Sequence, residues 1–348
     1  MLNSDYKSSL DKSIQWLKGT EKFSGGSSAY SAFGLAWSKA YPETTGYIIK
    51  TLLDYDRLYT DSVSKELALR FGTWLLSIQN DNGSWNGGFH PNLKASPSVF
   101  NTAQIIIGLH ALFIDSKDVI WKEAMQKAAL WLSNNVNEEG FWNEGHYNDF
   151  NPTYYTRVAW PMLLANEILK ENIISASALK VLDKMSSRVL SNGSFEYWGF
   201  KKDQPAFTHT IAYTIRGFIE SSILIQDWDR YAKLTEPAID RLYKFSELNG
   251  GRLPGYLDND WRIKGNFSCL TGNAQVAYCF FLMYNQHSDL RFVNAGTKLL
   301  EYNISKQSRS GAIAGSSPIY SKYMRMRYPN WAAKFHADAI MKLDSLSL

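Results

Sequence analysis

The chain has only two cysteines, Cys269 and Cys279, among its 348 residues. Their spacing fits neither a zinc-binding knuckle nor a small disulfide-stapled domain, so a reducing compartment is the simplest interpretation. The sequence shows no signal peptide and no run of about 18 apolar residues, which predicts a cytoplasmic protein without a membrane span. The net charge of +4 is mild and no run of five basic residues occurs, so nucleic acid is not an expected partner.

Aromatic residues, by contrast, are abundant: 12 Trp, 20 Tyr and 18 Phe. With 45% hydrophobic and 20% charged residues, the composition is that of a folded globular protein. A chain of this length usually forms two domains, but repeat architectures escape that limit because each unit needs only its neighbours. Large aromatic rings fill such cores and also line sugar- and isoprenoid-binding clefts. Their number therefore does not distinguish a structural role from a ligand-binding role.

A repeat of about 57 residues organises the chain. Its most regular element is a helix ending in Trp-Leu, followed nine residues after the Trp by a glycine turn. The turns lie at Gly25, Gly83, Gly140, Gly193, Gly251 and Gly311, the first three following Trp16, Trp74 and Trp131. Six such units account for nearly the whole chain.

Each unit combines an amphipathic helix with a helix that is apolar nearly all round. The amphipathic pattern predicts outer helices with one solvent face, and the all-round apolar pattern predicts buried inner helices. The expected outer helices include 62–79, 119–134, 177–190, 229–247 and 289–305. The expected inner helices are 45–55, 101–113, 155–168, 210–224, 272–284 and 330–341.

This alternation predicts an all-α fold, an (α/α)6 toroid of six helical hairpins that forms a single domain over residues 1–348. Short connections make neighbouring helices antiparallel, so all the inner helices begin at one mouth of the ring. An open superhelix of the same hairpins is the alternative.

The segment Gln79-Asn80-Asp81-Asn82-Gly83-Ser84-Trp85 resembles the Gln/Trp repeat of terpenoid cyclases and protein prenyltransferases. The catalytic signatures of that branch are missing. The DxDD motif is replaced by Asp258-Asn259-Asp260-Trp261, DDxxD is absent, and Phe267 stands where a zinc-binding Asp would precede Cys269. The Gln/Trp segment is therefore interpreted as a structural turn.

The helix order also resembles the six-hairpin glycosidases, and the toroid-type polysaccharide lyases and uronyl epimerases. Three segments, at 41–47, 270–275 and 328–335, look like toroid proteins associated with bacterial surface-polysaccharide gene clusters. The resemblance covers the whole chain and implies a carbohydrate-active protein, but it does not supply the reaction.

Polar residues recur where the inner helices begin, and polar groups on buried helices are costly unless they are paired or functional. The predicted catalytic residues are Glu43, His209, Tyr213 and Asp260. The predicted substrate-binding residues are Tyr41, Trp85, His90, Tyr155, Arg157, Trp198, Arg216, Trp261, Asn273, Gln275, Trp331, Lys334 and His336.

Several of these residues have structural alternatives. Thr45, Asn101, Thr210, Thr271 and Asn330 are candidate N-caps. The carboxylate of Glu43 would favour a helix dipole as well as catalysis. Three cations are expected on buried helices: Arg157, Arg216 and Lys334. They would either pair with Glu43 or Asp260, or bind an anionic ligand.

Two chemistries fit such a mouth. Glycoside hydrolysis needs two carboxyl groups, for which Glu43 and Asp258 or Asp260 are candidates. Elimination or epimerisation of a uronate needs a base such as Tyr213, Tyr155 or His209, with cations and amides to hold the substrate carboxylate. The cations slightly favour an acidic sugar. No metal or cofactor is expected, although calcium bound by Asp258 and Asp260 stays open.

The main hypothesis is therefore a hydrolase, lyase or epimerase that acts on an acidic oligosaccharide of surface-polysaccharide biosynthesis or modification. A non-catalytic glycan-binding or assembly protein is the first alternative. An isoprenoid-active enzyme is the second, and it predicts an apolar, aromatic-lined cavity deep in the ring.

Overall fold

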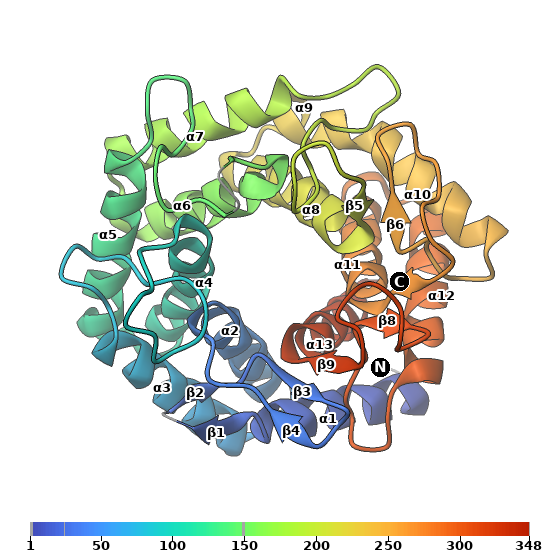
Figure 1. Ribbon diagram of the computed structural model, residues 1–348, viewed down its shortest axis with the longest axis horizontal. Coiled ribbons are helices and arrows are strands. Elements are labelled where there is room, and N and C mark those ends of the chain that lie inside the picture. Colours follow the sequence, from blue (N-terminus) through green and yellow to red (C-terminus); the bar gives the residue numbers. More distant parts are fainter. Residues whose placement is uncertain (1–2, 24, 148–149, 348) are drawn as a thin grey trace.

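The computed structural model describes residues 3–23, 25–147 and 150–347. It confirms the (α/α)6 toroid, with six inner helices around one axis and six outer helices around them (Figure 1). The inner helices are α2 (Pro42–Tyr59), α4 (Val99–Ser116), α6 (Thr156–Leu169), α8 (Thr208–Ile225), α11 (Leu270–His287) and α13 (Asn330–Asp344). The outer helices are α1 (Ser4–Lys18), α3 (Ser62–Ser77), α5 (Val119–Asn134), α7 (Asn172–Ser186), α10 (Glu236–Leu248) and α12 (Leu290–Lys306).

The first and last hairpins close the ring. Helix α13 packs against both α1 and α2. Strand β3 (Tyr30–Ala32), in the loop before α2, pairs antiparallel with β9 (Arg327–Pro329), in the loop before α13, and with β4 (Ala36–Trp37). These contacts between the two ends of the chain exclude the open superhelix.

The two ends of the inner helices differ. At the far end, five inner helices pass into the next outer helix through a residue with positive φ followed by an acidic residue. These links are Thr60-Asp61, Lys117-Asp118, Lys170-Glu171, Gln226-Asp227 and Ser288-Asp289. At the mouth, longer loops precede the inner helices and contain short paired strands, a departure from the purely helical expectation. The strand pairs are β1 (Glu21–Phe23) with β2 (Gly26–Ser27), β5 (Ala206–Phe207) with β6 (Tyr256–Leu257), and β7 (Ser268–Cys269) with β8 (Ser316–Ser317).

The repeat glycines share a packing role. Gly83 has a φ of +90°, and a Cβ atom there would lie 2.5 Å from the carbonyl oxygen of Lys127 in α5. At Gly311 a Cβ atom would lie 1.9 Å from the carbonyl oxygen of Lys12 in α1, which joins the last hairpin to the first. Glycine alone combines this φ with so close an approach at little cost. Gly140 and Gly251 also lie close to carbonyl oxygens of the next outer helix, so at four of the six repeat glycines the period is the spacing of backbone contacts between successive outer helices.

Two predicted outer helices have different bounds. Helix α7 begins at Asn172 and ends at Ser186, several residues before both predicted bounds. The segment predicted as one helix over 229–247 consists of α9 (Trp228–Tyr231), a 3-10 turn η2 (Ala232–Thr235) and α10. Pro237 lies in the first turn of α10 and does not fit inside a continuous helix, because its ring removes a backbone donor and clashes with the preceding turn.

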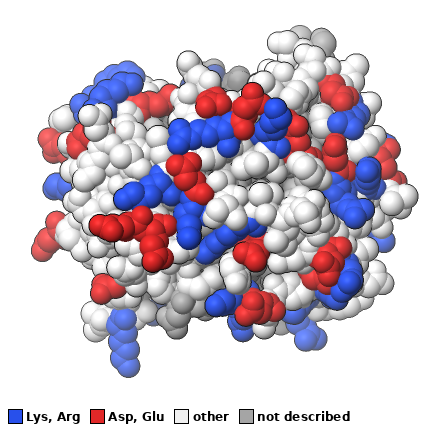
Figure 2. Space-filling model, turned by 90° about the horizontal axis from the view of Figure 1, so that it is seen from above, with Lys and Arg blue, Asp and Glu red and all other residues white. Residues whose placement is uncertain are grey.

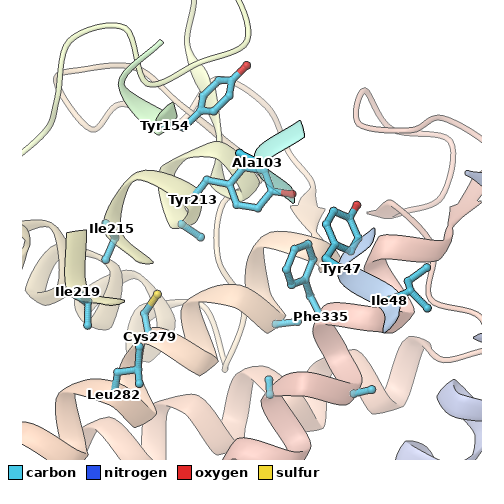
Figure 3. Packing of buried hydrophobic residues seen from close by; sticks show 14 of the residues in the cluster. Tyr47, Ile48, Ala103, Tyr154, Tyr213, Ile215, Ile219, Cys279, Leu282 and Phe335 are labelled. Atoms are coloured by element: carbon cyan, nitrogen blue, oxygen red, sulfur yellow. The ribbon is translucent and has the colours of Figure 1, made fainter. Parts of the chain in front are cut away.

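The inner helices are buried on nearly all sides. Figure 3 shows Tyr47, Tyr213 and Phe335 pointing toward one another from α2, α8 and α13, with Ile219 and Cys279 further along the axis. One helix, α4, is long and apolar enough to cross a membrane by length and composition, but 67% of that segment is buried inside the ring. The inner helix of a toroid is expected to be apolar and buried in the same way.

The five polar residues considered as N-caps are not N-caps, because each lies within the opening turns of its helix and not before it. The side chains of Thr45, Asn101 and Asn330 instead bind neighbouring loops. Asn101 donates from Nδ2 to the carbonyl of Asn86, and Asn330 donates from Nδ2 to the carbonyl of Ser28. These bonds fix the loops at the mouth onto the ends of the inner helices.

Candidate functional site

A cavity of about 490 Å³ opens where the inner helices begin. Its walls come from the opening turns of α2, α4, α8 and α13 and from the loops at this end. The volume lies within the range of small-molecule sites, which places a ligand of a few rings rather than a polymer inside it. Seven tyrosines line it: Tyr41, Tyr47, Tyr147, Tyr154, Tyr213, Tyr256 and Tyr323.

Glu43 supplies the only carboxyl group among the described lining residues. It follows Pro42 in the first turn of α2, where the helix dipole favours a negative charge. The hydroxyl groups of Tyr41 and Tyr47 hydrogen-bond with it, and Arg157 provides a nearby positive charge. Burial outweighs these effects and raises the pKa of Glu43 from 4.5 to about 7. Both protonation states are therefore accessible near neutral pH, as a general acid or base requires.

His209 and Tyr213 reach the cavity from α8, on the opposite side of the ring from α2 (Figure 1). The Nδ1 atom of His209 lies 2.6 Å from the side-chain amide of Gln275, which holds the ring in place. Burial lowers the pKa of His209 to about 3 and keeps the ring neutral. The hydroxyl groups of Tyr213 and Tyr47 hydrogen-bond, which connects α8 to Glu43.

Two lysines and further aromatic rings complete the walls. Lys201 and Lys322 come from the loops before α8 and α13, and the Nζ atom of Lys322 lies 4.1 Å from the centre of the Tyr256 ring. Trp331 donates from Nε1 to the hydroxyl group of Tyr323 at 2.9 Å. Rings offer apolar faces, hydroxyl groups offer hydrogen bonds, and the lysines can attract a carboxylate.

The predicted carboxylate-binding cations Arg216 and Lys334 are not in the cavity walls. Arg216 is 4% exposed and lies about two helical turns after the start of α8. Lys334 is 3% exposed and lies about one turn after the start of α13. Arg216 pairs with Glu220 at 3.1 Å, and Lys334 pairs with Asp338. Each of these cations has its counter-ion on its own helix, which corrects the expectation that they face a ligand.

Arg157 is also buried and lies outside the cavity lining. Its Nη2 atom donates to Oε1 of Gln104 at 3.1 Å. Its guanidinium carbon lies 4.5 Å from the centre of the Trp160 ring and 5.2 Å from that of the Tyr213 ring. Arg157 therefore acts on the cavity through its charge beneath the floor and does not line the site.

Asp260 is not opposite Glu43. Its carboxylate pairs with Arg262 at 3.2 Å on the surface, with 61% of the Asp260 side chain exposed. The neighbouring Asp258 pairs with Lys264 at 3.0 Å. The loop turns these carboxylates away from the cavity, which corrects the expected Glu43–Asp260 pair. Within the described residues, no three His, Cys, Asp or Glu side chains lie together as a metal site.

Three of the predicted sugar-binding tryptophans are core residues. Trp85 donates from Nε1 to the carbonyl of Leu75 at 2.8 Å. Trp261 donates to the carbonyl of Asn192 at 3.2 Å and packs edge-on against Trp198, with the ring centres 5.3 Å apart. All three rings are at most 4% exposed and are absent from the cavity walls, so their role is to hold turns onto helices.

Five more predicted binding residues lie outside the cavity lining: His90, Tyr155, Asn273, Gln275 and His336. Asn273 accepts a hydrogen bond from the backbone of Leu253 at 3.2 Å. The Nε2 atom of His336 lies 2.9 Å from the hydroxyl group of Ser9, on the outer side of its helix. The hydroxyl group of Tyr155 accepts from the backbone of Tyr147 at 3.0 Å and so positions a cavity residue.

The sequence interpretation included Glu43, Tyr41, His209, Tyr213 and Trp331, and the structure brings these five together. It missed the cavity residues that come from loops. Loops have no periodic pattern, so the only available signal was their place immediately before an inner helix. The missed loop residues are Tyr147, Phe200, Lys201, Gln204, Pro205, Phe207, Tyr256, Lys322, Tyr323 and Met324.

No family model and no curated protein matches the chain. Solved structures do match it over almost its full length. An unsaturated glucuronyl hydrolase specific for heparin has a TM-score of 0.78 at 13% identity, covering 97% of this chain and 96% of that chain. Cellobiose 2-epimerase from Bacillus thermoamylovorans has a TM-score of 0.77 at 13% identity, covering 98% of both. A sugar epimerase from a ruminal bacterium has a TM-score of 0.76 at 14% identity, covering 99% of both. The chain therefore has the fold of the six-hairpin toroids.

Proposed function

We propose that this protein is an enzyme that transfers protons on an acidic sugar held in the cavity, with Glu43 as the acid or base. One observation carries this: the described cavity wall has a single carboxyl group, the half-buried Glu43, which has a pKa of about 7 and is bound by tyrosine hydroxyl groups. His209 and Tyr213 approach from the opposite side of the ring. A sugar between them would have a proton-transferring group on each face.

Elimination or epimerisation of a uronate fits this set better than hydrolysis by two carboxyl groups. Such hydrolysis needs a second carboxyl group about 5–10 Å from the first, and the described cavity wall offers none. In epimerisation, Glu43 takes the proton from the carbon beside the sugar carboxylate, and a group on α8 returns a proton to the opposite face. In elimination, removal of the same proton is followed by loss of the neighbouring glycosidic oxygen. In its acid form, Glu43 would instead protonate an unsaturated uronate, to which water then adds.

The substrate class is an oligosaccharide that ends in an acidic sugar. Lys201 and Lys322 give the cavity wall two cations and the seven tyrosines give it hydroxyl groups, which suits a sugar carboxylate more than an isoprenoid. The similar fold of the glucuronyl hydrolase named above supports an acidic sugar, and those of the two epimerases support a sugar substrate in general. A cytoplasmic location and a place in surface-polysaccharide assembly stay predictions from the sequence.

The test uses uronate-ended oligosaccharides, both saturated and unsaturated, in heavy water. Elimination produces the ultraviolet absorbance of an unsaturated uronate, hydration removes that absorbance, and epimerisation incorporates deuterium without either change. We expect one of these signals from the native protein and its loss in Glu43→Gln, while Asp260→Asn, a surface carboxyl variant, keeps it.

Full activity in Glu43→Gln would disprove the site. New reducing ends without deuterium uptake or an absorbance change would disprove the reaction class in favour of two-carboxyl hydrolysis. A ligand that raises the melting temperature but is never converted would support the glycan-binding alternative.

A further inference from the structure

Three loops form one sector of the mouth: 28–41, 84–98 and 316–329. The first and third are joined by the β3–β9 pairing and by a hydrogen bond from the Phe33 backbone to the carbonyl of Met326. The first and second are joined by a bridge between Ala40 and His90 and by contact between the rings of Tyr41 and Phe89. We call these three loops the basic loop face.

The basic loop face contains no Asp or Glu in its sequence. It has five exposed cations: Lys39, Lys94, Lys322, Arg325 and Arg327. None of the five forms an ion pair with another described residue, although sixteen such pairs occur elsewhere. On the side of the ring that Figure 2 shows, by contrast, basic and acidic side chains are interspersed. The basic loop face therefore has uncompensated positive charge.

The same loops expose large apolar side chains at their tips. Leu93 is fully exposed, Leu35 is 84% exposed, and Phe33 and Tyr320 are 66% and 63% exposed. The tips are held by local backbone bonds: Leu35 donates to the carbonyl of Ala32, and the turn at Leu93 is closed by hydrogen bonds to Asn92. Exposed apolar side chains rimmed by polar groups mark interaction surfaces.

We propose that the basic loop face docks on an anionic lipid bilayer, with the four apolar tips entering the interface and Lys39, Lys94, Arg325 and Arg327 facing lipid phosphates. This combination is what holds peripheral proteins on anionic membranes. A soluble polyanion would use the cations but would gain little from fully exposed leucine tips. The far end of the ring has mixed charge instead, because an acidic residue follows each of five inner helices there.

The same loops also build the cavity. Tyr41, Ser98, Lys322 and Tyr323 lie on the basic loop face and line the cavity wall. A bilayer at this face would therefore lie beside the cavity opening, within reach of a sugar that is attached to a lipid. This inference concerns location and not the reaction, so it goes beyond the proposed function and can fail separately from it.

The experiment measures co-sedimentation of the full chain with vesicles of phosphatidylcholine, with and without phosphatidylglycerol. We expect binding only with phosphatidylglycerol, weakened by high salt. The double variant Leu35→Ser/Leu93→Ser should bind about tenfold more weakly, and Lys94→Gln/Arg325→Gln should lose a similar factor. The matched control is Leu290→Ser, which removes a leucine that is 58% exposed but lies at the start of α12, at the far end of the ring.

Neither Leu35→Ser nor Leu93→Ser should change turnover of a soluble sugar, because these side chains are outside the cavity. Absence of binding to phosphatidylglycerol vesicles would overturn the proposal. So would binding that the leucine variants leave unchanged while a soluble acidic polysaccharide competes, since that result assigns the face to a polyanion.

Discussion

Two layers of the same barrel handle charge in opposite ways. In the cavity layer, Glu43 has no counter-ion bonded to it, and tyrosine hydroxyl groups hold it. In the layer below, Arg216 pairs with Glu220 and Lys334 pairs with Asp338, each one turn along the same helix. Helices α8 and α13 contribute to both layers. The comparison teaches that Arg216 and Lys334, which have local counter-ions, support the fold, whereas Glu43, which is held by neutral hydroxyl groups, faces the space for a ligand.

The largest expected effect is on the cavity layer. Glu43→Gln should lower kcat/KM about a thousandfold, because the variant cannot transfer a proton, while the fold is retained. Steady-state kinetics on the substrate found by the heavy-water test, with circular dichroism as the control, measure this. A loss of less than about tenfold would show that another group transfers the proton.

Breaking the lower layer should affect stability instead. Asp338→Ala should reduce the free energy of unfolding by about 3–5 kcal/mol, because the buried ammonium group of Lys334 loses its partner. Urea unfolding measures the change. Asp229→Ala, which removes an exposed partner of Lys233 with the same four-residue spacing, is the matched control and should change little. Equal effects of the two variants would contradict the distinction between the layers.

The raised pKa of Glu43 gives the cavity layer its own pH dependence. The folded state keeps this proton up to about pH 7, whereas an unfolded glutamate loses it near 4.5. The stability from the bound proton is therefore present below pH 4.5 and declines by roughly 3 kcal/mol as the pH rises to about 7. Unfolding free energies measured across this range should fall in the native protein relative to Glu43→Gln. Parallel curves would show that Glu43 has an ordinary pKa.

Activity should follow the same titration. If Glu43 acts as a base, kcat/KM rises as the pH passes through about 7, and if it acts as an acid, kcat/KM falls there. The pH profile of kcat/KM therefore also distinguishes proton abstraction from hydration of an unsaturated sugar.

The lysines of the cavity wall should have a smaller effect. Lys201→Gln or Lys322→Gln should raise KM for an acidic sugar about five- to tenfold and leave a neutral analogue nearly unaffected, because an exposed charge contact contributes modestly. KM values for matched uronate and neutral sugars test this. Equal changes for both sugars would show that the lysines do not contact the carboxylate.

The smallest effect is expected at the surface. Asp260→Asn should change the free energy of unfolding by less than about 0.5 kcal/mol and leave turnover unchanged, because its pair with Arg262 is exposed. A large loss of activity in Asp260→Asn would show that Asp260 belongs to the site and would contradict its position on the surface.

The sequence by itself determined the repeat, the inner and outer helices and the end at which the site lies. Glycine is required wherever φ is positive and a neighbouring backbone lies as close as it does at Gly83, so the period was visible in the residue types. Helices that are apolar all round had to be buried, which placed Glu43, His209 and Tyr213 on the inner ring.

Only the tertiary structure decided which polar residues face the cavity. Arg216 and Glu43 look alike in sequence, as charged residues on buried helices, but helical rise carries Arg216 about two turns along α8 from its start, where Glu220 neutralises it. Loop residues such as Lys322 and Tyr256 are positioned by strand pairing between loops, which no periodic pattern encodes. The position of the mouth could be predicted from the sequence because burial follows residue type. Which residues line the cavity could not, because that depends on contacts between segments far apart in sequence.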